Sequence, residues 1–184
     1  MKPIDLTNVQ ERREGDFERL PAGGYVCRIT AVKDNAEKER LELEYDIAEG
    51  KYLGYHSETY ARAGFWGGRF IRSYSDKAQG FFKGFLTAVE QSNPGFAWNW
   101  DEKTLSGKLL GIVVGEREYV ARDGSVKVGQ EVTMVRSVKA IKEGDFKVPE
   151  LRKLTDAQRP AIHVSAPAPA AAGFTEITDE DLPF

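Results

Sequence analysis

Residues 41–47 read Leu-Glu-Leu-Glu-Tyr-Asp-Ile, with an apolar side chain at every second position. A period of two is typical of a β-strand that buries one face and turns the other towards water or a neighbouring subunit. The buried positions are Leu41, Leu43, Tyr45 and Ile47, and the outward positions are Glu42, Glu44 and Asp46. Because one strand cannot cover its own apolar face, the chain must build a sheet around this segment.

Two neighbouring segments predict partner strands. Residues 25–32 place Tyr25, Cys27, Ile29 and Ala31 on one side, and Cys27 fits a small core residue there. Residues 51–61 follow a turn at Glu49-Gly50 and predict a third strand, which carries three tyrosines into the next segment.

A helix and a hairpin complete the expected domain. Ser75 or Asp76 is a suitable N-cap for a helix over about residues 77–92, and Asn93-Pro94-Gly95 ends it. Its apolar stripe is formed by Phe81, Phe82, Phe85, Leu86 and Val89.

Residues 109–121 and 126–141 predict two strands joined at Asp123-Gly124, with Val132, Met134, Arg136 and Val138 on one face. After Phe96, Trp98 and Trp100 fit a core plug or extra stacking surfaces equally well.

Length and composition predict one soluble domain with appendages, in 184 residues. We divide the chain into a flexible N-terminal arm (1–20), a folded domain (21–155) and a flexible, disordered tail (156–184). No apolar run reaches the roughly 20 residues that a membrane helix needs, and Met1–Leu6 lacks the apolar core of a signal peptide. These features favour a cytoplasmic protein, in the host cytoplasm if phage-encoded, with no membrane partner.

The inventory of reactive residues argues against an enzyme. One cysteine and two histidines exclude an internal disulfide and make a zinc cluster untenable. The chain has no phosphate-binding loop with its lysine and no G-x-S-x-G or H-E-x-x-H motif, so we expect no catalytic residue, metal or cofactor. A magnesium site made only of carboxylates stays open, because 29 acidic residues are present.

The stretch from Tyr52 to Lys83 combines aromatic and basic residues. Seven aromatic residues fall between Tyr52 and Tyr74, and from Arg62 to Lys83 five basic residues oppose one acidic residue. Stacking surfaces interleaved with cations suit a single-stranded nucleic acid of any sequence, and three glycines suit a flexible loop. An ordinary aromatic core with a solvated rim is the alternative. The candidate DNA-binding residues are Tyr52, Tyr55, Tyr60, Arg62, Phe65, Trp66, Arg69, Phe70, Arg72, Tyr74, Lys77 and Lys83.

The C-terminus has a different composition. Residues 166–173 are an Ala/Pro linker, and residues 160–184 contain four acidic residues and no basic one. The chain ends Asp179-Glu180-Asp181-Leu182-Pro183-Phe184, which resembles the C-terminal tip of bacterial and phage single-stranded DNA-binding proteins. The resemblance implies that this tip binds replication, recombination and repair proteins. A solubilising acidic tail would leave Leu182 and Phe184 unexplained.

A second resemblance covers roughly residues 20–150. Leu20–Tyr25, Glu49–Gly54 and Leu105–Gly111 look like a phage replication-region family of single-stranded DNA-binding type. That family implies an OB-type β-barrel of five strands with a helix between the third and fourth, which the order of predicted elements also supports. Residues 61–104 are long for a compact OB-fold, so either the helix is extended or a lid is inserted.

The sequence therefore predicts a non-enzymatic OB-fold protein that coats single-stranded DNA without sequence preference during phage or mobile-element replication or recombination. The alternatives are a metal-dependent nucleic-acid enzyme, and an adaptor or virion protein that binds no DNA. The oligomeric state, a homo-oligomer included, is left open by the sequence.

Overall fold

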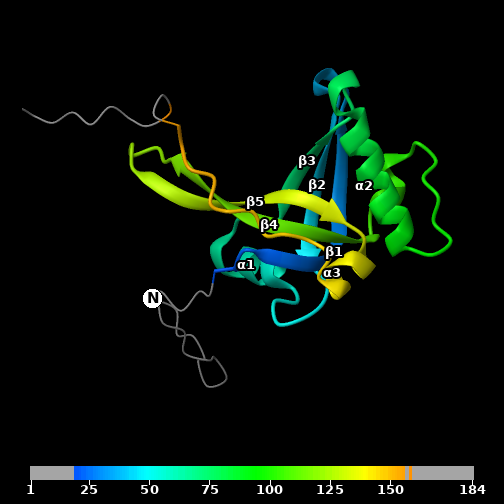
Figure 1. Cartoon of the computed structure of the whole chain (residues 1–184), viewed down its shortest axis with the longest axis horizontal. Helices are drawn as coiled ribbons and strands as arrows, with labels where there is room; N and C mark the ends of the chain where they lie inside the picture. The colour runs from blue at the N-terminus through cyan, green and yellow to red at the C-terminus, as the bar shows by residue number, and fades with distance from the viewer. Residues whose placement is uncertain (1–18, 156–157, 159–184) are drawn as a thin grey trace, which may run out of the picture.

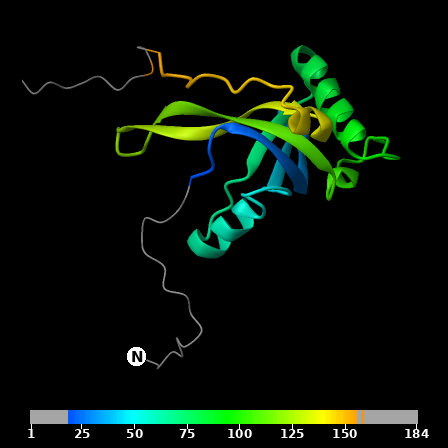
Figure 2. The ribbon, with the colours of Figure 1, turned by 60° about the horizontal axis from the view of Figure 1, so that its bottom comes forward.

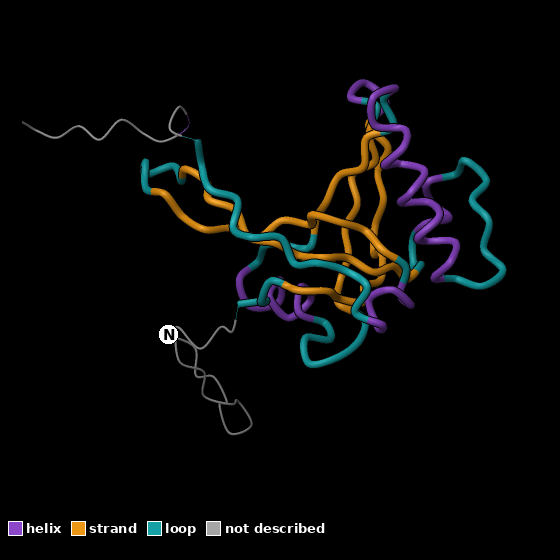
Figure 3. The backbone as a smooth tube through the Cα atoms, in the orientation of Figure 1, coloured by secondary structure: helices purple, strands orange, loops and turns teal. Residues whose placement is uncertain are grey.

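An open, antiparallel five-stranded sheet forms the centre of the molecule (Figures 1 and 3). The structure is a computed structural model that describes residues 19–155 and residue 158. The strands are β1 (Gly23–Asn35), β2 (Arg40–Ile47), β3 (Arg69–Ser73), β4 (Leu109–Val120) and β5 (Val126–Arg136), in the spatial order β3-β2-β1-β4-β5. The mainly β fold is confirmed. Since β3 and β5 are the two edges, the sheet of the described residues is not closed into a barrel.

Strand β2 follows its alternating pattern. Leu41, Leu43, Tyr45 and Ile47 are all buried, as predicted. The prediction fails at Asp46, which is only 8 % exposed. Its carboxylate lies beneath the start of helix α1 (Tyr55–Ala63) and accepts hydrogen bonds there, so it is turned away from water.

Two irregularities in strand pairing change which residues face the core. The pairing of β1 with β2 shifts between Ile29 and Ala31, so the core contact passes from Ile29 to Val32 and Ala31 is exposed. The pairing of β4 with β5 shifts between Val113 and Val114. An extra residue in one strand reverses the alternation beyond it.

In β5, Val132 and Val135 therefore both pack on the core, and the predicted common face of residues 132–138 is wrong. Strand β5 also ends earlier than expected, at Arg136. The next residue, Ser137, caps helix α3 (Val138–Glu143), because its side chain accepts a hydrogen bond from the Ala140 amide.

Helix α1 occupies the segment for which a third strand was predicted. Gly50 and Gly54 have φ angles of +87° and +73°, which end the extended backbone before Tyr55. Residues 55–63 bury His56 and Thr59, three positions apart, whereas a strand would bury every second residue. The tyrosines favour a strand by propensity, but turn geometry and the buried carboxylate of Asp46 stabilise a helix here. The third strand is β3, which begins only at Arg69.

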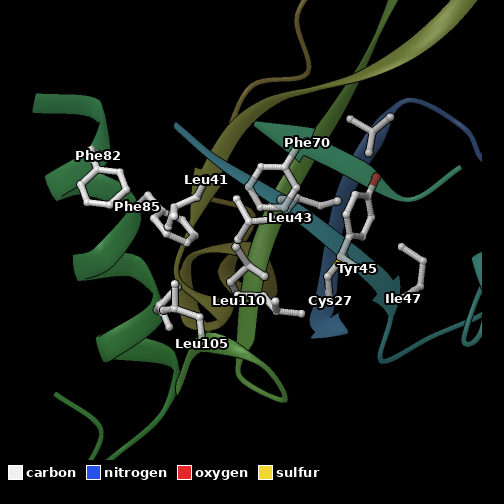
Figure 4. Close-up of a cluster of buried hydrophobic side chains, with 14 of the residues drawn as sticks. Cys27, Leu41, Leu43, Tyr45, Ile47, Phe70, Phe82, Phe85, Leu105 and Leu110 are labelled. Carbon is white, nitrogen blue, oxygen red and sulfur yellow. The ribbon is translucent and has the colours of Figure 1, made fainter. Parts of the chain in front are cut away.

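Helix α2 (Gln79–Ser92) is preceded by the short helix η2 (Asp76–Ala78) and confirms the predicted helix. Phe82, Phe85 and Val89 are buried against the sheet, and Figure 4 shows Phe82 and Phe85 on the same side of the sheet as Leu41 and Phe70. Phe81, which the sequence pattern places in the same stripe, is 82 % exposed, so the buried stripe is narrower than predicted.

The connections fix the ends of these elements. Helix η1 (Ala36–Lys38) joins β1 to β2, and helix η3 (Glu102–Leu105) precedes β4. The Asn93 side chain ends α2 and bonds the backbone of Leu109 at both its amide and its carbonyl. Residues 94–101 form a loop beside α2, and this loop, together with β3, α2 and η3, takes up most of the length of residues 61–104 (Figure 1).

The tip of the β4–β5 hairpin extends past β1, and residues 150–154 lie beside it. Figure 2 shows α1 and α2 at opposite ends of the sheet. Leu20, placed in the N-terminal arm by the sequence, is 2 % exposed and packs in the core. The other expectations for the arm, and those for the linker and the tip, lie outside the described residues.

Candidate nucleic-acid interface

A groove of about 770 Å³ runs along the free edge of β3. Its walls come from β1, β2 and β3 on one side and from β4 and β5 on the other, so it occupies the gap between the two edges of the sheet. We call it the β3 groove. Its basic residues are Lys33, Arg40, Arg69, Arg72 and Arg117, and its acidic residues are Glu42, Glu44 and Glu131. The lining is therefore net basic.

Most of these charges are engaged in exposed or half-exposed ion pairs. Arg40 lies 2.6 Å from Glu42, Arg69 lies 2.8 Å from Glu44, and Arg117 lies 3.5 Å from Glu131. The hydrogen bond from Arg40 lowers the pKa of Glu42, so this carboxylate stays ionised at neutral pH. Surface ion pairs are individually weak, and a phosphate can compete with a carboxylate for an arginine at little cost.

Arg72 is the most deeply set cation of the β3 groove. It lies over the Phe70 ring, 5.0 Å from its centroid, and its guanidinium donates to the Ile71 carbonyl. Burial lowers its pKa to about 10, so it remains protonated at neutral pH. Its neighbour Ile71 is 47 % exposed on the other face of β3. Because Ile71 also lines the groove, the groove combines a partly buried cation with an exposed apolar side chain at the edge of the sheet.

The twelve candidate DNA-binding residues do not form one surface. Only Arg69, Phe70 and Arg72 line the β3 groove, and Phe70 is buried at 7 % exposure. Tyr52 and Tyr55 are half-buried and pack against the core, where the Tyr55 hydroxyl accepts a hydrogen bond from the Leu20 amide. Tyr52, Tyr55 and Phe70 therefore occupy the positions of ordinary core residues, which was the alternative to a stacking surface.

A second group gathers around α1. Tyr60 and Phe65 are 54 % and 60 % exposed, and Arg62 is exposed at the end of the helix. Trp66 is half-buried: its ring contacts His56 and Tyr60, and its indole N–H donates to the Gly68 carbonyl. The glycine segment is not simply a flexible loop. A Cβ on Gly68 would lie 2.2 Å from the Tyr45 carbonyl oxygen, so the close approach of the segment before β3 to β2 requires glycine.

The third group lies at the other end of the sheet, beside α2. Tyr74 packs against the core and its hydroxyl donates to Asp34. Lys77 and Lys83 are exposed on η2 and α2. Figures 1 and 2 show how far the sheet separates this end from α1.

Sequence reasoning missed three of the basic groove residues, Lys33, Arg40 and Arg117. They come from β1, β2 and β4, and only sheet pairing brings them next to β3. Lys33 and Arg40 stand at the two ends of the connection between the first two predicted strands (25–32 and 41–47), and this position was the available signal. In an OB-type fold that connection borders the binding face.

The imidazole ring of His56 is buried and has no hydrogen-bond partner among the described residues. The residue is 5 % exposed. The rings of Tyr45 and Tyr55 lie 5.0 Å and 5.1 Å away, centroid to centroid. Burial lowers the pKa of His56, and the nearby Asp46 carboxylate opposes this in part. The folded protein therefore holds His56 in its neutral form at neutral pH.

This environment predicts that the free energy of unfolding falls as the pH is lowered from about 7 to about 5. In that range the unfolded chain protonates His56 while the folded chain resists protonation, so acid favours unfolding. The loss is about 1.4 kcal/mol for each unit by which folding lowers the pKa, and most carboxylates titrate below this range. Urea unfolding at several pH values measures it. His56→Leu should flatten the dependence and His163→Gln should leave it unchanged; a dependence that survives His56→Leu would contradict the assignment.

Over residues 19–155 and 158, no group of three or more His, Cys, Asp or Glu side chains is placed to hold a metal ion. Among the helices described above, none has the length and apolarity needed to cross a membrane. Neither the models of known protein families nor the curated proteins compared with this chain gave a match.

Proposed function

We propose that this chain binds single-stranded DNA without sequence preference, with the strand lying along the β3 groove. The observation that carries the proposal is the placement of the groove. It follows an edge strand in which Arg69 and Arg72 stand on either side of two apolar residues, and the lining has more basic than acidic side chains. Cations neutralise phosphates, and apolar surface beside them contacts the unpaired bases and sugars.

The strand order supports an OB-type fold for this proposal. An OB barrel has five strands, and oligonucleotides bind across its second and third strands between the β1–β2 and β4–β5 connections. Here the β3 groove lies over β2 and β3, with Lys33 and Arg40 at its β1–β2 end and Arg117 contributed by β4. Helix α2 falls between β3 and β4 in the chain, as the resemblance implied.

The biological setting follows from the resemblances of the sequence. The protein coats DNA during phage or mobile-element replication or recombination and carries out no chemistry itself. The tip, residues 179–184, recruits replication and repair enzymes: Phe184 enters an apolar pocket of the partner while the carboxylates meet basic residues. The tail tethers these enzymes to coated DNA, because its Ala/Pro linker supplies reach without forming a core.

Replacing both Arg69 and Arg72 with alanine should weaken binding to every sequence alike, about tenfold or more at low salt. Two phosphate contacts are lost, so the slope of log affinity against log salt should become shallower by about 1.4. Fluorescence anisotropy with a labelled oligo-dT at several salt concentrations measures both quantities.

The matched control is Lys139→Ala with Lys147→Ala, which removes two exposed cations outside the β3 groove. The control should keep the wild-type slope to within about one fifth of a unit. An unchanged slope in the Arg69/Arg72 variant, or an equal change in the control, would show that the groove does not hold the DNA backbone.

A further inference from the structure

A second hollow, of about 620 Å³, lies beside α2 and has a mostly apolar lining. We call it the α2 hollow. Its walls include Leu41, Tyr74, Phe82, Leu86, Trp98 and Trp100. Its charged groups are mixed, with Lys83 opposed by Asp34 and Glu102. Such a lining suits a flat, largely uncharged group that carries a few polar atoms on its edge.

Trp100 stands out within this lining. It is 83 % exposed, and its φ angle is +69°, a conformation that a bulky side chain rarely adopts. A glycine would occupy this position without strain, so the backbone alone gives no reason for a tryptophan. A strained residue that presents a large apolar ring to solvent suggests a binding role.

The neighbouring indole holds Trp100 in place. The two rings lie 4.8 Å apart with an angle of 41° between their planes. Trp98 is itself anchored: its amide donates to Glu90, its indole N–H donates to the Asp101 carbonyl, and its ring contacts Phe82 at 5.6 Å. The pair therefore forms a supported aromatic wall whose outer ring is open to a ligand.

The α2 hollow continues the β3 groove. Residues two apart, which share a face of the sheet, line the two sites: Val32 and Leu43 line the groove, while Asp34 and Leu41 line the hollow. Arg72 of β3 lines the groove, and Tyr74, just past the end of the strand, lines the hollow. A DNA strand that follows β3 towards its C-terminal end arrives at Trp100.

We propose that the α2 hollow binds an unpaired base of the same DNA strand, stacked on Trp100. This inference rests on the proposed function and adds an exposed aromatic ring for stacking, which the groove lacks because its one aromatic side chain, Phe70, is buried. The apolar walls take the plane of the base, and Gln79, Asp34 and Glu102 meet its polar edge. Lys83 lies on the rim, where the flanking phosphate passes.

The experiment compares wild type with Trp100→Gly over a series of oligo-dT lengths. Glycine suits the φ angle, so the melting temperature should be unchanged or higher while the stacking ring is lost. An oligomer of about five nucleotides, which fills the groove alone, should bind both proteins equally. One of about fifteen nucleotides, which also reaches the hollow, should bind the variant about tenfold more weakly. Tryptophan quenching by the long oligomer should also shrink in the variant.

Phe81→Ala is the matched control, because Phe81 is as exposed as Trp100 but does not line the hollow. It should bind both lengths as wild type does. If Trp100→Gly binds the long oligomer normally while Arg69→Ala/Arg72→Ala weakens it, the inference is wrong and the proposed function stands. If Phe81→Ala loses as much affinity as Trp100→Gly, the loss is not specific to the hollow and the inference also falls. If wild type binds no oligomer, the proposed function fails, and the inference fails with it. If Trp100→Gly binds DNA normally but no longer self-associates, the hollow is a protein-binding site and the inference is wrong.

Discussion

Replacing Asp46 with alanine is expected to lower the free energy of unfolding by about 3 kcal/mol or more, well above the loss from an ordinary surface substitution. The carboxylate is buried on β2 and accepts hydrogen bonds from the amides of Ile47, His56 and Ser57 and from the Ser57 hydroxyl. Alanine leaves these backbone amides without their acceptor, and two of them belong to the first turn of α1.

The energetic reason lies in the helix terminus. Gly54, at the N-cap of α1, has no side chain to cap the first amides, so Asp46 supplies the missing acceptor from a strand that precedes the helix in the chain. A carboxylate near the positive end of a helix is stabilised by the helix dipole as well as by its hydrogen bonds. Loss of this contact should unfold α1 first and lower the melting temperature of the whole domain.

Urea unfolding followed by circular dichroism measures the effect, and two variants control for it. Asp46→Asn keeps an acceptor for the Ile47 and His56 amides but presents an amide to Ser57, so its loss should be intermediate. Glu58→Ala removes an exposed acid from the same helix turn and should cost less than about 1 kcal/mol. A loss in Asp46→Ala no larger than that in Glu58→Ala would show that Asp46 does not hold the helix.

The fold was predictable where one periodicity dominated the sequence. The strict alternation of residues 41–47 predicts β2, and the apolar stripe ending at Asn93-Pro94-Gly95 predicts α2. The pattern could not place Asp46, because a carboxylate at an outward position of a strand is ordinarily solvated. Its burial depends on a helix in a segment whose propensity favours a strand. The same tyrosines that favour a strand also pack against the end of the sheet, so tertiary contacts decided the outcome.

The candidate site was predictable only in part, for a geometric reason. Arg69 and Arg72 were found because they lie close together in the chain, and they do line the β3 groove. The aromatics around them form one cluster in the sequence. In the structure, the edge strand β3 lies between Trp66, which is beside α1, and Tyr74, which is beside α2. Lys33 and Arg117 reach the groove only through strand pairing, which a local stretch of sequence does not reveal.

Single-stranded DNA should bind at least about a hundredfold more tightly than a duplex of the same sequence. The groove has five basic and three acidic side chains, so neutralising phosphates accounts for only part of the affinity. The remainder must come from bases that contact apolar surface, at about 1–3 kcal/mol for each stacked base. Two such contacts give about a hundredfold, and a duplex offers none of them because its bases are already paired and stacked.

The same reasoning predicts little dependence on base sequence. Every base has a π-face that can stack, and the groove presents mainly charged and apolar groups, with Gln130 its one side-chain amide. Affinities for oligo-dT, oligo-dC and a mixed sequence should therefore agree within about threefold. A protein that reads duplex DNA would instead need polar side chains placed to meet the edges of the bases in a groove of the helix.

Titration of the full-length protein into a fluorescently labelled oligo-dT of about fifteen nucleotides, and in parallel into the matching dT–dA duplex at the same salt concentration, tests the central claim most directly. The predicted result is saturable binding to the single strand and at least about a hundredfold weaker binding to the duplex. Equal or tighter binding to the duplex, or no binding to either DNA, would contradict the assignment of the β3 groove to single-stranded DNA.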